Sequence, residues 1–209
     1  MGVLVKSSEK IGKILLNKPL ILKGLGRFLT DDELFDFCQM NTPFQIERDH
    51  NQNLKIMEPI SGDSGWQESE VTGELFVWNK QAKSGKTFST PTGFYLPNGA
   101  LKSSDGSWMS LEKWEKITPQ ARQKFLYAVP DFIVEIRSPS DSLTDLKAKM
   151  EEWIENGVQL AWLIDPKKEK AYIYRKNGSI DTVDGFDGTL SGENVLDGFE
   201  FDLSVFKNQ

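Results

Sequence analysis

The sequence contains a charged residue in the middle of a stretch that otherwise has the composition of a buried β-strand. In PDFIVEIRSPSD, residues 130–141, apolar side chains around Glu135 occupy both parities, which is typical of a strand covered on both faces. We therefore expect Glu135 to be buried. A buried carboxylate costs several kcal/mol unless a cation, a metal ion or hydrogen-bond donors compensate it. The sequence leaves open three partners: Arg137, a lysine of a neighbouring helix, and a metal ion.

A buried glutamate followed by a lysine-bearing helix is compatible with a metal-dependent nuclease. In such a site, carboxylates on adjacent strands hold Mg²⁺, which neutralises charge at phosphorus and lowers the pKa of an attacking water. A lysine then orients that water. Short D/E-x-K patterns are frequent by chance, and the residue two positions after Glu135 is Arg137, which binds phosphate or carboxylate better than it accepts a proton. The pattern by itself is therefore weak.

The elements around Glu135 are predicted to form a β-α-β unit. The strand is followed by Ser142, a candidate helix cap, and by the helical segment LTDLKAKMEEWIEN, which ends at Gly157. The apolar strand VQLAWLID comes next and stops at Pro166. A strand, a helix and a strand of this size predict that the two strands lie parallel in one sheet.

The rest of the chain predicts further elements of both kinds. Capping-box spacing of Thr30 and Glu33 indicates a short helix, and Thr118 before Pro119 indicates another that ends before Pro130. The other predicted elements are a hairpin of FQIERD and NLKIMEP, a long helix over 65–82, short strands at KTFST, GFYLP and GSWMS, and a hairpin around Asn177-Gly178. Residues 1–28 are predicted to be an extended arm.

Composition excludes several classes of protein. The 209 residues include a single cysteine, Cys38, and a single histidine, His50, so a disulfide and a Cys/His zinc cluster are excluded. A net charge of −6 argues against a broad nonspecific nucleic-acid binder but leaves room for a local basic groove. No apolar run approaches the roughly 20 residues that span a bilayer, and no secretory pattern is present at the N-terminus. We expect a cytoplasmic protein with no membrane segment.

Four segments, in order and with compatible gaps, resemble a known family over roughly residues 30–170. They are ESEVTGELFVWN, TGFYLPNGALKSSDGSW, VPDFIVEIRSPSD and DLKAKMEEWIENGVQLAWLIDP. The chain resembles the restriction-endonuclease family that is abundant in cyanobacteria and other bacteria, within the PD-(D/E)XK nuclease superfamily. The resemblance implies an α/β, restriction-endonuclease-like fold: a central mixed β-sheet flanked by helices, with an N-terminal helix and β-hairpin. Residues 1–28 would be an extension, and residues 29–209 the nuclease domain.

The resemblance also implies two metal ligands, Asp105 and Glu135. From the residues alone, Asp105 precedes Gly106 in SSDGSW and has the pattern of a solvated turn. The more visible Asp131 is four residues from Glu135 on the same strand, roughly 13 Å away, which is too far for the two to share one ion. We expect Asp131 to close the entrance of the strand instead.

The resemblance matches Lys149 as the catalytic lysine, moved from the strand to the following helix. Lys147 and Lys149 lie at similar angles on opposite sides of the apolar stripe, so periodicity cannot choose between them, and Arg137 occupies the usual lysine position. On the long helix, the resemblance implies that Glu70 faces the metal site. Glu68 and Glu74 are alternatives. The tryptophans, Trp66 and Trp78 among them, are expected to be core residues rather than base-stacking platforms.

These observations predict a DNA endonuclease that depends on Mg²⁺, with Mn²⁺ as a substitute. Its proposed residues are Asp105, Glu135, Lys149 and Glu70. Cleavage of both strands of a duplex predicts a homodimer, whose two-fold axis would match that of the DNA. Two alternatives remain: a non-catalytic binding or assembly module that keeps this fold, and an ordinary α/β domain in which Glu135 forms a salt bridge.

Overall fold

A mixed six-stranded sheet forms the centre of the protein. The computed structural model describes residues 6–7, 10–11 and 19–207. In the order β13-β12-β11-β10-β9-β6, the strands are β13 (Ile180–Asp184), β12 (Lys170–Arg175), β11 (Leu160–Asp165), β10 (Phe132–Ile136), β9 (Gly106–Ser110) and β6 (Gly85–Ser89). The β10 and β11 strands are parallel, and the other neighbouring pairs are antiparallel. The predicted fold class and the parallel β-α-β unit are confirmed.

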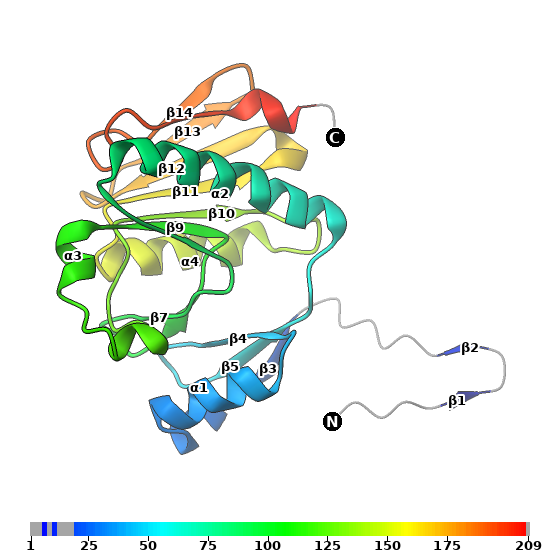
Figure 1. Ribbon diagram of the computed structural model, residues 1–209. Helices are drawn as coiled ribbons and strands as arrows, with labels where there is room; N and C mark the ends of the chain where they lie inside the picture. The colour runs from blue at the N-terminus through cyan, green and yellow to red at the C-terminus, as the bar shows by residue number, and fades with distance from the viewer. Residues whose placement is uncertain (1–5, 8–9, 12–18, 208–209) are drawn as a thin grey trace.

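Two helices cover opposite faces of this sheet. In β10, Phe132 and Val134 pack in the same core cluster as α2 (Gly62–Ala82), whereas Ile133 packs in the cluster that includes α4 (Leu143–Glu155). Figure 1 shows α2 and α4 on the two sides of β10. All five residues of β10 are buried, as are all six of β11, so these two strands are apolar on both parities because both faces are covered. The prediction that Glu135 is buried is confirmed.

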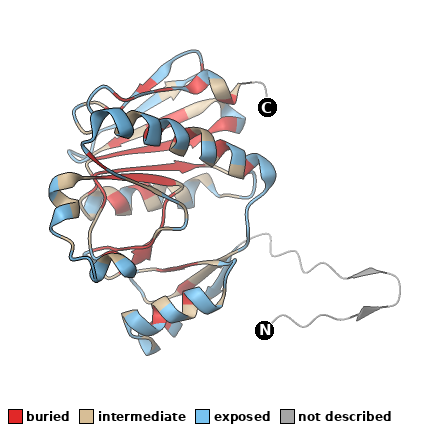
Figure 2. Cartoon of the chain, in the orientation of Figure 1, coloured by how far each residue is buried: buried red, intermediate tan, exposed pale blue. Residues whose placement is uncertain are grey.

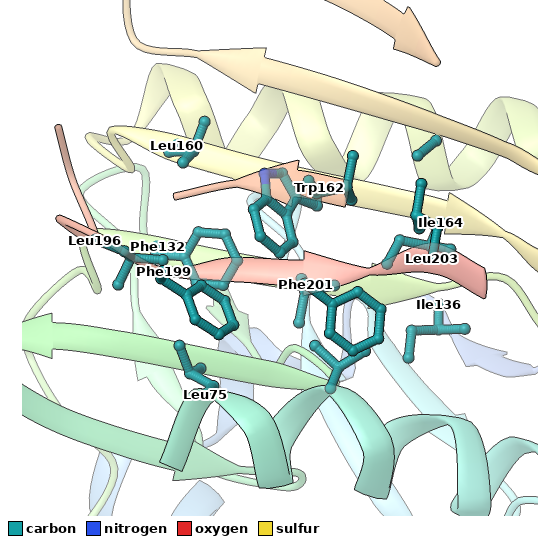
Figure 3. Close-up of a cluster of buried hydrophobic side chains, with 14 of the residues drawn as sticks. Leu75, Phe132, Ile136, Leu160, Trp162, Ile164, Leu196, Phe199, Phe201 and Leu203 are labelled. Carbon is teal, nitrogen blue, oxygen red and sulfur yellow. The ribbon is translucent and has the colours of Figure 1, made fainter. Parts of the chain in front are cut away.

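The C-terminal segment packs beside α2 on the same face of the sheet. It contains β14 (Thr189–Ser191), β15 (Glu200–Asp202) and the 3-10 helix η4 (Leu203–Phe206). Phe199 from this segment stacks on Trp162 of β11, with ring centroids 5.7 Å apart and planes inclined by 13°. Figure 3 shows these rings between the strands, together with Leu75 of α2, and Figure 2 shows that burial is concentrated in the central strands. This face of the sheet is therefore occupied by apolar packing.

A second, five-stranded sheet lies on the other side of the molecule with α1 (Asp31–Met40) (Figure 1). Its order is β3 (Leu20–Leu22), β5 (Leu54–Met57), β4 (Gln45–Arg48), β8 (Leu101–Lys102) and β7 (Phe94–Tyr95). The predicted hairpin is the antiparallel β4–β5 pair, and the capping box of Thr30 and Glu33 is present at α1. Both sequence predictions are confirmed.

The predicted N-terminal extension falls partly outside the described residues. Two short strands, β1 (Lys6–Ser7) and β2 (Lys10–Ile11), pair with each other. Leu20–Leu22 pairs with β5, and the 3-10 helix η1 (Leu25–Phe28) follows it. Residues 20–28 thus pack with the second sheet instead of forming a separate arm.

The predicted helix from Thr118 to Pro130 is wrong. After the short helix α3 (Leu111–Glu115), the segment contains only a 3-10 turn, η2 (Ala121–Gln123). The chain then extends, because Leu126 donates its N–H to the carbonyl of Gly93 at 2.9 Å and accepts from Tyr95 N at 2.8 Å. A Cβ on Gly93 would lie 2.4 Å from the Phe125 ring, so the glycine permits this approach. Pairing with β7 outweighs the local helix signal.

The tryptophans behave as predicted with one exception. Trp153 and Trp162 are fully buried, Trp108 is buried and Trp78 is partly buried. Trp66 is 39% exposed and meets Phe206 edge-on, so the prediction that it is a core residue is wrong.

The remaining 3-10 helix, η3 (Pro166–Lys168), follows β11. In the described part of the chain, every helix is too short or too polar to cross a membrane.

Candidate active site

The register of β9 and β10 places Asp105 beside Glu135. The strands pair Phe132 with Trp108 and Val134 with Gly106, so the register continued by one residue sets Asp105 opposite Glu135. Two hydrogen bonds fix this position: Asp105 N donates to the carbonyl of Val134 at 3.1 Å, and Ile136 N donates to Asp105 Oδ2 at 2.7 Å. Side chains of directly opposite residues point to the same face of a sheet. The solvated turn that the sequence favoured for Asp105 is wrong.

Lys149 of α4 reaches Glu135 from the face that α4 covers. Its Nζ lies 2.8 Å from Glu135 Oε1, and the Glu135 side chain is 5% exposed. Glu135 Oε1 is buried, and the Lys149 ammonium lies at ion-pair distance from it, so the lysine partly compensates the buried charge. A buried carboxylate that is compensated only in part is suited to an additional cation or donor.

Glu47 of β4 is a second carboxylate that forms an ion pair with Lys149. Its Oε1 lies 3.0 Å from Lys149 Nζ, and its side chain is 2% exposed. Ser103 N also donates to Oε1, at 3.3 Å. Burial opposes the charge of Glu47, but the nearby ammonium groups of Lys149 and Lys102 outweigh it and lower the pKa of Glu47 to about 2. The second sheet therefore supplies a permanent negative charge to this site.

The charged network continues from Glu47 to the surface. Lys102 Nζ lies 3.9 Å from Glu47 Oε2 and 3.0 Å from Glu152 Oε2, and Glu152 belongs to the same helix as Lys149. Glu152 also lies 3.4 Å from the His50 ring and accepts from Asn98. Acidic and basic groups thus alternate from Glu135 outward, and both sheets and α4 contribute to the network.

Glu68 is the glutamate of α2 that approaches the site. Thr90 Oγ1 lies 3.1 Å from Glu68 Oε2 and 2.9 Å from the carbonyl of Asp105, which connects the helix to the end of β9. Burial and then the charge of Glu135 raise the pKa of Glu68, and Thr90 partly offsets them. Glu70 lies elsewhere: it accepts a hydrogen bond from Trp66 Nε1 at 2.8 Å on its own helix. The geometry favours the alternative Glu68 over Glu70.

The two facing carboxyl groups both titrate far above their ordinary range. Burial, followed by the charge of Glu68, raises the pKa of Asp105 to about 7, although Asp105 keeps partial access to solvent. Burial raises the pKa of Glu135 to about 8; the Lys149 ammonium opposes this rise, and the charge of Asp105 adds to it. Three carboxylates near one ammonium leave excess negative charge, and this excess favours either a proton or a metal ion.

The other candidate cations are engaged elsewhere. Lys147 lies over the ring of Tyr172, with its Nζ 4.0 Å from the centroid. Arg137 forms an ion pair with the buried Asp165, at 2.6 Å, and donates to the carbonyl of Asp141. Of the three cations that the sequence left open, Lys149 is therefore the one that contacts Glu135.

Asp131 closes the other end of β10. Its carboxylate accepts from Ser110 N at 2.9 Å and from Gln159 Nε2 at 2.5 Å, and it pairs with Lys113 Nζ at 2.8 Å. Ser110 and Lys113 belong to the junction of β9 and α3, and Gln159 lies just before β11, so Asp131 joins the segments that flank the strand, as the sequence predicted.

Sequence reasoning did not identify Glu47 as part of the site, or Lys102 and Glu152 as the surface end of the charged network around it. In FQIERD, Ile46 has the pattern of an inward side chain and Glu47 that of an outward one. Glu47 is buried because its outer face meets α4 and β8, and the hairpin sequence carries no signal of that contact. Only the docking of two sheets brings these groups together.

Comparisons with known proteins agree with this fold. One solved structure, described as "a putative nuclease belonging to DUF820 from Anabaena variabilis", superposes with a TM-score of 0.67 at 20% identity and covers 85% of this chain and 97% of that one. This likeness supports the fold alone. A search of curated proteins finds no match. A family model described as "Uma2: Putative restriction endonuclease" matches residues 31–205, and the chain therefore belongs to the Uma2 family.

Proposed function

We propose that the protein is a nuclease that hydrolyses phosphodiester bonds in DNA and depends on Mg²⁺ or Mn²⁺. The observation that carries this proposal is the pairing of Asp105 with Glu135 on adjacent strands, next to the ammonium of Lys149. The membership in a family described as restriction endonucleases supports nucleic acid as the class of substrate.

Asp105 and Glu135 would hold the cation. The burial of Glu135, the adjacent positions of the two carboxyl groups and their raised pKa values fit a divalent ion. Mg²⁺ keeps several waters and uses one or two protein carboxylates, which matches the two proposed ligands. When bound, the ion would supply charge neutralisation at the phosphate and a water of lowered pKa.

Lys149 would orient the attacking water. Its Nζ contacts two buried carboxylates. Burial opposes its charge, but Glu135 and Glu47 together outweigh burial, so the pKa of Lys149 is raised. It therefore acts as a donor and a positive charge rather than as a base. This role suits the stabilisation of negative charge that develops on a phosphate oxygen.

Glu68 would be the outer carboxylate of the site, in the position that the sequence gave to Glu70. Its side chain is tied through Thr90 to the backbone of Asp105. It can accept a hydrogen bond from a water beside Asp105 and so hold that water in place. We retain the homodimer as part of the proposal, since a two-fold pair of sites would cut both strands of a duplex.

The test is cleavage of supercoiled plasmid DNA in the presence of Mg²⁺ or Mn²⁺. We expect the parent protein to cleave, and Asp105→Asn and Lys149→Ala to lose about 10²-fold or more of the rate. Lys147→Ala is the matched control. Lys147 lies on the same helix, but its ammonium contacts the ring of Tyr172 instead of the site carboxylates, so the rate should stay close to that of the parent. Conversion to linear plasmid together with a dimer in sedimentation would support double-strand cutting.

A stability measurement separates an enzyme from a non-catalytic module. Lys149→Ala leaves Glu135 and Glu47 without their shared cation, so the metal-free variant should be less stable than the parent. Saturating Mg²⁺ should restore much of that stability by replacing the lost charge. Absence of cleavage, of metal-dependent stabilisation and of rescue would support the alternative, a binding or assembly module that retains the fold.

A further inference from the structure

The ammonium of Lys149 is shared by two buried carboxylates that belong to different sheets. Glu135 comes from β10 of the central sheet and Glu47 from β4 of the second sheet, and both lie within 3.0 Å of Nζ. The proposed nuclease function uses Glu135 and Lys149 and gives no role to Glu47. A second buried carboxylate on the same cation costs desolvation energy, so its contribution to the site requires an explanation.

The surroundings of Glu47 hold it in one place. Ser103 N donates to Oε1, and Lys102 lies near Oε2 while it is itself paired with Glu152. Lys149 and Glu152 are on the same helix, so α4 contacts the second sheet at two points. This arrangement fixes the position of Glu47 relative to α4 independently of Glu135.

A divalent ion on Asp105 and Glu135 would repel the nearby ammonium of Lys149. If Glu135 were the only partner of Lys149, the ion and the ammonium would compete for one carboxylate. A second carboxylate on the same Nζ removes this competition, because it retains the lysine while Glu135 binds the ion. Partners of this kind usually change metal affinity or activity by about 10- to 100-fold when they are mutated.

We propose that Glu47 is a positioning residue that anchors Lys149 beside the two proposed metal ligands, so that a divalent ion and the lysine can occupy the site together. The inference rests on the proposed nuclease function. It extends the site into the second sheet and predicts that the β4–β5 hairpin is required for metal binding as well as for folding.

The test compares Glu47→Gln with Glu152→Gln, a control at the surface end of the charged network that lies outside the proposed metal and water site. Both variants remove one carboxylate from the same network and keep the side-chain length, but Glu152 contacts Lys102 and not Lys149. For Glu47→Gln we expect Mn²⁺ affinity, measured by calorimetric titration, to fall about tenfold or more, and kcat to fall about 10- to 100-fold with little change in KM for DNA. The control should stay within about threefold of the parent in the same measurements.

A purely structural role for Glu47 would give a different result. It would lower the melting temperature of Glu47→Gln without changing Mn²⁺ affinity or kcat of the folded protein, and that outcome would overturn the inference. If Glu47→Gln does not fold, Glu47→Asp keeps the charge and withdraws it by one methylene. A loss of kcat in Glu47→Asp supports the anchor, and parent-like values contradict it.

Failure of the nuclease proposal is distinguishable from failure of this inference. If the parent protein neither binds Mn²⁺ nor cleaves DNA, the proposed function fails and the inference fails with it. If the parent does both and Glu47→Gln behaves like Glu152→Gln, the anchor alone is wrong.

Discussion

Two buried carboxylates at opposite ends of β10 differ in how completely the fold satisfies them. Asp131 accepts from a backbone N–H and an amide and pairs with Lys113. Burial opposes its charge, but these donors outweigh burial and lower its pKa. Glu135 has one lysine, shared with Glu47, and its pKa is raised to about 8.

This difference separates a structural carboxylate from a candidate ligand. Both residues are buried and both have a lysine partner, so burial and ion pairing alone do not distinguish them. The number of hydrogen-bond donors distinguishes them. The protein fills the acceptor positions of Asp131, whereas Glu135 can still bind an external cation. We therefore expect mutations at the two ends of one strand to affect different properties.

The largest effect should come from Asp131→Ala, on stability. The change leaves Lys113, Ser110 N and Gln159 without their acceptor, and we expect the free energy of unfolding to fall by about 3–4 kcal/mol. Urea unfolding measures this change. Asp181→Ala, which breaks an exposed pair with Arg175, is the control and should cost less than about 1 kcal/mol. Similar losses in the two variants would contradict the structural role of Asp131.

Glu135→Gln should leave the metal-free protein nearly as stable as the parent, because Lys149 keeps Glu47 as a partner. Its effect should appear on addition of metal. At a Mg²⁺ concentration of about 100 times Kd, a bound ion stabilises the parent by about 2.7 kcal/mol, and the variant should lose this gain. Thermal unfolding with and without Mg²⁺ measures the difference. Equal metal-dependent shifts in the two proteins would remove Glu135 from the metal site.

The stability of the metal-free protein should fall as the pH rises, because the pKa of Glu135 is raised. The folded state binds a proton at Glu135 more tightly than the unfolded chain does, so this contribution is complete below the ordinary value of 4.5 and is lost as pH rises through about 8. We expect the free energy of unfolding to fall progressively across this window. Urea unfolding in a chelator measures it. Glu135→Gln should remove the part of the fall that comes from Glu135, while Asp105, whose pKa is raised to about 7, still contributes. Asp131, with its lowered pKa, contributes no such fall.

The smallest effect should separate Glu68 from Glu70. Glu68→Gln removes the carboxylate that is tied to Asp105 through Thr90, and we expect the cleavage rate to fall about tenfold. Glu70→Gln affects only a contact with Trp66 on the helix surface and should change the rate by less than about twofold. Plasmid cleavage under identical Mg²⁺ gives both values. The reverse order would restore Glu70 as the outer carboxylate.

Most of the fold was predictable because local signals agreed with tertiary packing. The parallel unit around β10 and β11, the α1 capping box and the β4–β5 hairpin all follow from periodicity, caps and turns. The helix predicted after Thr118 failed because Leu126 pairs with the backbone beside β7. That partner is far away in the sequence, and no local sequence pattern indicates the pairing.

The candidate site was predictable only in part. The burial of Glu135 follows from the apolar residues around it, and the resemblance to a known family supplied Asp105 and Lys149. Glu47 could not be found, because a charged residue at an outward position of a hairpin normally faces solvent. Its burial depends on contact between two sheets, and such contacts are a property of the assembled fold.

The position of the charged network across both sheets has a consequence for the order of folding. Glu47 and Lys149 come from distant regions of the sequence, so a large loop must close before their contact forms. The apolar strands and α4 gain stability earlier, from more local contacts. We therefore expect substitutions at Glu47 and Lys149 to change the unfolding rate and to leave the refolding rate almost unchanged, with the charged site assembling after the rate-limiting barrier.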